Sequence, residues 1–245
     1  MKNTLRLTYS VNSYEVDPLG AARLTTIANF LQETAYKHAH SLNLGYTHLN
    51  ENNRAWILSR MRIRIFQYPA WDDQVIVETW PRGVDKLFAL RDFRIYDTNN
   101  LVLAEATTCW LMVDSSNHRP LRIPHDIIKI QTRSDSVFSE IPGKISLPET
   151  IHIYETRMVR YSDLDVVGHV NNVKFIEWCT DLAGPEKFLE NTVTDFSINF
   201  IGEALPGDQV EISSSEMADN IICISGKNSG SGKECFRAQM QLRKI

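Results

Sequence analysis

The feature that most limits the fold of this chain is an internal repeat, a short polar turn followed by an apolar helix pattern. Residues 14–31 align with residues 162–179 at a constant offset of 148, which pairs Asp17 with Asp165. Each turn runs directly into apolar residues at helical spacing, typical of a helix with one buried face. In the first copy these residues are Leu24, Ile27, Ala28, Leu31 and Ala35, and in the second Val173, Ile176 and Cys179.

Strand-like segments follow both helix patterns. Residues 59–68 alternate between polar and apolar side chains, as expected for a strand with one buried face. An Asp-Gln-Val triplet follows in each half, and pairing Asp73 with Asp208 places Tyr68 opposite Glu203. The expected strands are residues 56–68, 76–80, 88–96 and 102–113, then 195–203, 210–216, 221–227 and 234–242, with hairpin turns at 99–100 and 229–232.

Each half therefore predicts a strand, a turn, one long helix and several antiparallel strands. An antiparallel sheet wrapped around one apolar helix is the hot-dog architecture, so the chain predicts an α+β, tandem (double) hot-dog fold. The repeats are expected at residues 1–130 and 149–245, with a surface connection over 131–148. Two unrelated α+β halves are the alternative. The repeated turn and the repeated triplet favour duplication.

Composition excludes several classes of protein. The 245 residues are 43% hydrophobic and 23% charged, as in globular proteins. The net charge of −4 argues against nucleic-acid binding, and no apolar run approaches the ~20 residues of a membrane span. The N-terminus lacks the features of a secretory signal, so we expect a cytoplasmic protein. The cysteines lie far apart in the sequence and are expected as reduced buried thiols: Cys109, Cys179, Cys223 and Cys235.

The second turn is where we expect chemistry. Asp165 and His169 lie at a loop-to-helix junction, where the helix dipole and free N–H groups stabilise negative charge on an oxygen. Ordinary helix capping also explains polar residues at such a place. The two halves differ here, because the first has Ala21 opposite His169 and Tyr68 opposite Glu203. Only the second half therefore combines the aspartate with a histidine and a glutamate.

Residues 163–178 read Asp-Leu-Asp-Val-Val-Gly-His-Val-Asn-Asn-Val-Lys-Phe-Ile-Glu-Trp. This segment closely resembles the active-site segment of the acyl-acyl carrier protein thioesterases, fatty-acid-releasing enzymes of plants and bacteria with a hot-dog fold. The resemblance covers most of the chain and is strongest over 161–206. It implies hydrolysis of fatty acyl-acyl carrier protein thioesters, which ends chain elongation. It also implies that the catalytic residues are Asp165, His169 and Glu203.

The sequence departs from this family at two positions. The family often has Asn two residues before the histidine, where this chain has Val167. Plant members often have Cys after the acid, where this chain has Ala204, so a covalent cysteine mechanism is not expected. We expect attack by a water that His169 and Glu203 position and deprotonate. Asp165 is left with three possible roles: orienting the site, accepting a proton, or acting as a nucleophile.

The oxyanion donors and the acyl-binding tunnel of such a site are less clearly marked in the sequence. Backbone N–H groups of residues 169–171 are expected to stabilise the oxyanion, and no metal or redox cofactor is needed. An acyl chain requires an apolar tunnel, for which the first helix and sheet are candidates. Ordinary core packing is the simpler interpretation of the same apolar residues, which are Phe30, Trp56, Met61 and Ile65.

The expected partner is an acidic acyl carrier protein. Because this chain is itself mildly acidic, recognition would require a local positive patch and would weaken as salt rises. Three alternating arginines would share one strand face, with a solvated sheet face as the equal alternative. The candidate cations are Arg60, Arg62, Arg64, Arg82, Lys86 and Arg91. The oligomeric state is left open between a monomer with an internal pseudo-dimer and a homodimer.

Three rival functions fit the same fold: an acyl-CoA thioesterase, a hydratase or dehydratase, and a non-catalytic acyl-binding module. Hydratases also use an acid with a histidine, but the spacing of Asp165 and His169 is closer to that of the thioesterases. Retention of His169 and Glu203 in one half argues against the binding module.

Overall fold

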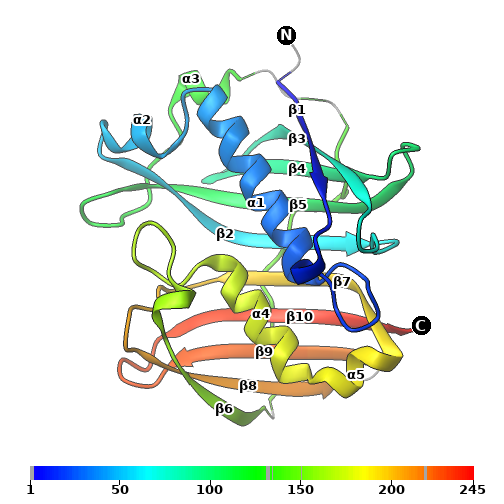
Figure 1. The fold of residues 1–245 in the computed structure, drawn as a ribbon. Coiled ribbons are helices and arrows are strands. Elements are labelled where there is room, and N and C mark those ends of the chain that lie inside the picture. Colours follow the sequence, from blue (N-terminus) through cyan, green and yellow to red (C-terminus); the bar gives the residue numbers. More distant parts are fainter. Residues whose placement is uncertain (1–2, 131–132, 134, 150, 218–219) are drawn as a thin grey trace. The chain divides into compact units, whose positions relative to one another are not determined.

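The computed structural model describes residues 3–130, 133, 135–149, 151–217 and 220–245 (Figure 1). The chain forms two compact units, Met1–Pro142 (unit 1) and Gly143–Ile245 (unit 2). The expected repeat boundaries at 130 and 149 stay a prediction, and residues 131, 132 and 134 of the expected connection lie outside the described residues. No helix in the described part of the chain is long and apolar enough to span a bilayer.

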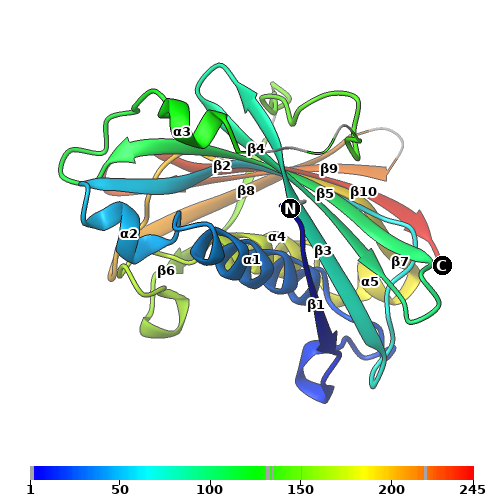
Figure 2. The same ribbon diagram turned by 90° about the horizontal axis from the view of Figure 1, so that it is seen from above.

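Unit 1 has one long helix and a five-stranded antiparallel sheet in the order β1-β3-β4-β5-β2. The strands arch over α1 (Figure 2). The elements are β1 (Leu5–Ser10), η1 (Ser13–Glu15), α1 (Leu24–Ser41), α2 (Tyr46–Asn50), β2 (Arg54–Ile65), β3 (Gln74–Asp85), β4 (Phe88–Tyr96), β5 (Val102–Asp114) and α3 (His125–Ile128).

Unit 2 repeats this topology, with the strand order β6-β8-β9-β10-β7 and the helix α4. Its elements are β6 (His152–Met158), η2 (Tyr161–Asp163), α4 (Asn172–Ala183), α5 (Pro185–Glu190), β7 (Asn191–Phe200), β8 (Gln209–Met217), β9 (Ile221–Asn228) and β10 (Glu234–Lys244). Each unit is thus a hot-dog, and the tandem hot-dog fold expected from the sequence is confirmed.

The helix stripes predicted from the sequence form the cores. All five predicted residues of α1 and all three of α4 are buried. In unit 2, the ring of Phe175 packs edge-on against Trp178 at 5.2 Å and lies 5.1 Å from Phe236. Burial of such apolar side chains is the main favourable contribution to folding. Of the residues considered for an acyl tunnel, Phe30, Met61 and Ile65 are fully packed core.

Three strands differ clearly from their predicted limits. The strand expected at 56–68 is β2, which ends at Ile65. β3 was expected to end at Trp80, but it continues through Pro81 to Asp85. The pairing of β1 with β3 ends at Thr79, so Pro81 lies where β3 has a neighbour on one side only, a place where a sheet tolerates proline. The strand expected at 195–203 is β7, which ends at Phe200. Glu203 consequently lies in a loop.

The outer face of the unit 1 sheet, which points away from α1, is covered by residues 135–142. The N–H of Val137 donates to Asp92 Oδ2 at 3.1 Å, and the indole N–H of Trp80 donates to the carbonyl of Asp135 at 3.3 Å. Phe138 is only 4% exposed. This segment therefore belongs to the packing of unit 1.

The same segment corrects the expectation of an exposed arginine patch. Arg60 donates to the carbonyl of Pro142 at 2.9 Å. The guanidinium carbons of Arg62 and Arg64 lie 4.6 and 4.9 Å from the centre of the Phe138 ring. The three arginines do share one strand face, as predicted, but they are half-buried against this segment.

Candidate active site

Asp165 shapes the loop that precedes α4. Its Oδ1 accepts the N–H of Val167 at 2.9 Å and the N–H of His169 at 3.3 Å. Its own N–H donates to the carbonyl of His169 at 2.8 Å. Gly168 has a φ of +85°, a conformation that side chains with a Cβ rarely adopt. The carboxylate and the glycine together close the turn that carries His169.

Asp17 makes the same contacts in unit 1. Its Oδ1 accepts the N–H groups of Leu19 at 2.9 Å and Ala21 at 3.0 Å, and its N–H donates to the carbonyl of Ala21 at 2.8 Å. Gly20 has a φ of +79°. The predicted pairing of Asp17 with Asp165 is therefore a pairing of equivalent backbone structures, and this aspartate contact does not depend on a neighbouring histidine.

A second loop in each unit, which follows β2 or β7, is held against the first. In unit 2 the N–H of Val170 donates to the carbonyl of Ala204 at 3.0 Å. In unit 1 the N–H of Ala22 donates to the carbonyl of Pro69 at 2.8 Å. The offsets of 148 and 135 read from the sequence relate these two bonds to each other. Glu203, one residue before Ala204, is therefore brought to the turn of His169.

His169 and Glu203 face each other across these two loops. His169 Nδ1 lies 3.7 Å from Glu203 Oε1, and the side chains are 29% and 42% exposed. This distance is in ion-pair range but longer than a hydrogen bond. Both groups remain accessible to a substrate.

The neighbours of Glu203 restrict where its backbone lies. A Cβ on Gly202 would stand 2.6 Å from the carbonyl oxygen of Glu234, closer than atoms can pack. Only glycine therefore allows the end of β7 to run this close to β10. On the other side, Ala204 is completely buried.

The expected oxyanion donors are already engaged. The N–H of Val170 donates to Ala204, the N–H of Asn171 donates to the carbonyl of Asp163 at 2.8 Å, and that of His169 points at Asp165. The expectation that residues 169–171 supply these donors is therefore wrong. Asn171 instead caps α4, because its Oδ1 accepts the N–H of Val173 at 2.8 Å.

Comparison with known proteins identifies the family. The family profile described as "Acyl-ACP thioesterase N-terminal domain" matches residues 2–131, and that described as "Acyl-ACP thioesterase C-terminal domain" matches residues 149–244. The chain belongs to the acyl-ACP thioesterase family. ACP here is acyl carrier protein. The family name agrees with the resemblance seen around His169.

Individual relatives support this membership in the acyl-ACP thioesterase family. The chain is 33% identical over 197 residues to a "Palmitoyl-acyl carrier protein thioesterase, chloroplastic" of Gossypium hirsutum, an alignment that covers 75% of this chain and 48% of that protein. A corresponding Arabidopsis thaliana protein is 32% identical and 47% covered. The chain thus spans about half the length of these curated relatives.

Solved structures of this family have the same fold. An acyl-ACP thioesterase from Bacteroides thetaiotaomicron superposes with a TM-score of 0.91 at 25% identity, covering 98% of both chains. A 12:0-ACP thioesterase from Umbellularia californica superposes with a TM-score of 0.88 at 22% identity, covering 100% of this chain and 99% of that one.

The departure from the usual family pattern at Val167 leaves an exposed apolar side chain. Val167 is 52% exposed and Val166 is 97% exposed. The N–H of Val167 still closes the Asp165 turn. The loop therefore keeps its shape without the family's asparagine, and this position has no side-chain amide.

The cysteines of this acyl-ACP thioesterase family member are unsuited to nucleophilic attack. All four are free and buried, as predicted. Burial raises the pKa of Cys109 to about 12 and the pKa of Cys235 to about 11. Burial also raises the pKa of Cys179 and Cys223. Thiols held in the neutral form are poor nucleophiles.

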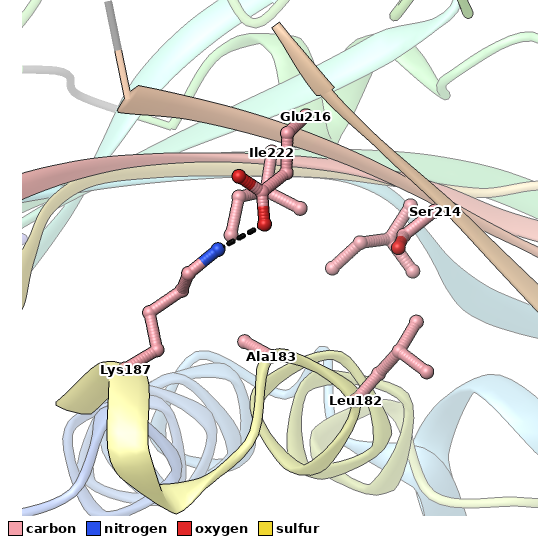
Figure 3. Close-up of a pocket in the computed structure, with 7 residues that line it drawn as sticks. Leu182, Ala183, Lys187, Ser214, Glu216 and Ile222 are labelled. Atoms are coloured by element: carbon pink, nitrogen blue, oxygen red, sulfur yellow. Dashed lines mark hydrogen bonds and ion pairs between the residues drawn. The ribbon is translucent and has the colours of Figure 1, made fainter. Parts of the chain in front are cut away.

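A hollow of about 340 Å³, including its open mouth, lies in unit 2 between the end of α4 and the sheet (Figure 3). Leu182 and Ala183 line one side of it, and an ion pair between Lys187 and Glu216 crosses it. His169 precedes the opposite end of α4. This hollow is therefore separate from the loops that carry the candidate catalytic residues.

Proposed function

We propose that this chain hydrolyses fatty acyl-ACP thioesters and releases free fatty acids, which ends chain elongation. The observation that carries the proposal is the 3.7 Å approach of His169 and Glu203. The equivalent loops of unit 1 have the same backbone bonds but carry Ala21 and Tyr68. A family member that retains an acid and a base in only one of two equivalent loops fits a single hydrolytic site.

His169 and Glu203 would act as one base. Glu203 faces Nδ1 of His169, so a proton held there leaves Nε2 free to accept a proton from water. The water oxygen bonds to the thioester carbon, and the carbonyl oxygen becomes an oxyanion. Collapse of that intermediate breaks the carbon–sulfur bond. His169 then returns its proton to the departing thiolate, giving a carboxylic acid and a thiol.

Asp165 is proposed as a positioning residue. Its Oδ1 already accepts two N–H groups, and Asp17 makes the same bonds in the half without a histidine. This supports the orienting role over the nucleophilic role. We propose that the backbone N–H of Asn172 donates a hydrogen bond to the oxyanion. Asn172 is the first residue of α4 and therefore lies at the positive end of the helix dipole.

The proposal is tested by hydrolysis assays with one acyl group presented on ACP, on CoA and on a short pantetheine mimic. We expect the highest kcat/KM with ACP and a loss of ~10²-fold or more for His169→Ala. Faster turnover of the CoA thioester would favour an acyl-CoA thioesterase. Binding of acyl-ACP without turnover by the folded wild type would favour the non-catalytic module.

Partner, location and assembly follow the same proposal. The partner is acyl-ACP, as the names of the relatives suggest. Those relatives carry the word chloroplastic in their names, whereas the sequence of this chain predicts a cytoplasmic protein. Whether it is a monomer or a homodimer stays a prediction, decided by light scattering after gel filtration.

A further inference from the structure

Unit 1 contains a guanidinium on the inner face of its sheet, that of Arg91, whose polar side-chain contacts to the described residues are with neutral groups. Arg91 Nη1 lies 2.8 Å from His38 Nδ1 on α1 and donates to Thr79 Oγ1 at 3.2 Å. His38 is only 3% exposed. Among the described residues, no carboxylate forms an ion pair with Arg91. An unpaired charge in such a place is costly unless a ligand or water compensates it.

The nearest acid in the sequence cannot compensate this charge. Asp92 follows Arg91 on β4, so strand alternation points it to the opposite face of the sheet. There it accepts Thr107 Oγ1 at 2.6 Å and the N–H of Val137 at 3.1 Å. Arg91 therefore lies on the inner face of the sheet, and Asp92 lies on the outer face.

The partner imidazole is neutral. Because a guanidinium only donates, His38 Nδ1 must accept from Arg91 and carry a lone pair. Burial, with a smaller effect of Arg91, lowers the pKa of His38 to about 4. Burial lowers the pKa of Arg91 to about 10, so the guanidinium stays charged at neutral pH. The cluster therefore carries one net positive charge.

This cation lies where the inner face becomes accessible. Ala89 and Trp110, which are paired across β4 and β5 beside Arg91, are half-buried like Arg91 itself. Phe93 and Ile95, further along the same face, are each 1% exposed. Arg91 thus lies at an apolar end of the core that is not closed off from solvent. A group that is apolar along its length and anionic at one end would match both features.

We propose that Arg91, supported by His38 and Thr79, binds a carboxylate carried on an aliphatic chain. The planar guanidinium matches a carboxylate with two parallel N–H bonds, and Ala89 and Trp110 offer apolar contact to the chain. Two sources share this chemistry, namely a free fatty acid and an acyl group with a carboxyl at its far end. The second source rests on the proposed function, whereas the binding itself does not.

Calorimetric titration with decanoate, and with decanol as the uncharged control, tests the binding. We expect wild type to bind decanoate at least ~10-fold more tightly than decanol. Arg91→Met should abolish that preference. Arg91→Lys keeps the positive charge but cannot form the two parallel N–H bonds of a guanidinium, so it should reduce the preference. The control is Arg62→Met on the outer face of the same sheet, which should retain the preference.

The inference fails if folded wild type shows no preference for decanoate, or if folded Arg91→Met retains it. If Arg91→Met does not fold, the same titration is made with Arg91→Lys. An unchanged preference for decanoate in that variant would show that the two parallel N–H bonds of the guanidinium are not needed, and the inference would fail. These binding results hold even if the chain hydrolyses no thioester, an outcome that would reject only the proposed function.

A second assay distinguishes the two sources. Pantetheine thioesters of undecanoic acid and of an eleven-carbon dicarboxylic acid would be compared as substrates. Faster hydrolysis of the carboxyl-ended substrate, lost in Arg91→Met, supports an acyl group as the source. Equal hydrolysis together with Arg91-dependent inhibition by decanoate supports a free fatty acid. Neither effect in an active enzyme counts against the site.

Discussion

The turns before α1 and α4 have the same hydrogen bonds and opposite chemical content. In each, an aspartate Oδ1 accepts two N–H groups, and a second loop is tied on by a backbone bond of 2.8 or 3.0 Å. Only the turn of unit 2 carries His169, and only its second loop carries Glu203. The comparison teaches that the aspartate and glycine specify the shape of the loops, while two side chains specify what they can do.

The interiors of the two units differ in a related way. Unit 2 packs aromatic rings between α4 and its sheet, among them Phe175, Trp178 and Phe236. Unit 1 places His38 and Arg91 on the corresponding inner face. The unit without the candidate catalytic pair therefore has the more polar inner face.

The largest effect should come from removing either member of the pair. We expect His169→Ala and Glu203→Gln each to lower kcat by ~10²-fold or more, because the water loses its base. Tyr68→Phe, at the position equivalent to Glu203, should stay within ~2-fold, since unit 1 lacks a histidine there. Steady-state kinetics on proteins with matched circular dichroism checks this. A ~10²-fold loss of kcat in folded Tyr68→Phe would contradict a single active site in unit 2.

Asp165 should show an intermediate effect that distinguishes positioning from nucleophilic attack. Asp165→Ala removes the acceptor of two N–H groups and should lower kcat by ~10-fold as the loop loosens. Asp165→Asn keeps an acceptor oxygen and should remain within ~3-fold of wild type. If the asparagine variant were as inactive as His169→Ala while folded, Asp165 would have to take part in the chemistry directly.

Asp17→Ala should affect stability alone. Loss of the equivalent acceptor in unit 1 should cost about 1 kcal/mol of unfolding free energy, the usual value for a partly exposed turn bond. Asp165→Ala should cost a similar amount, because the two aspartates make the same bonds. Urea unfolding of both variants, with turnover measured in parallel, checks this. Turnover of Asp17→Ala is expected within ~2-fold of wild type.

The smallest effect should be that of salt. The sequence predicts a clear fall of kcat/KM for acyl-ACP, but most of the proposed cations are packed against protein. Arg60, Arg62 and Arg64 lie under residues 138–142, Arg82 lies 3.9 Å from Asp92, and Arg91 faces α1. Lys86 remains exposed. We therefore expect no more than a ~3-fold decrease from low salt to physiological salt.

A short acyl-thioester mimic is the control for this last measurement, and it should hardly respond to salt. Lys86→Gln should remove most of the small response seen with acyl-ACP, mainly by slowing association. A steep salt dependence that survives in Lys86→Gln would show that another positive surface recognises the carrier protein.

The sequence by itself determined the duplicated architecture, the helix stripes, most strand positions and the pairing of Asp17 with Asp165. These depend on local periodicity and on turn residues whose backbone needs are short-range. Only the tertiary structure decided that Arg60, Arg62 and Arg64 are covered, that the N–H groups of residues 169–171 already have acceptors, and that Arg91 contacts His38. Each of these depends on which segment packs against a side chain or which acceptor a loop brings near, and contacts between residues distant in the chain leave no periodic signal in it.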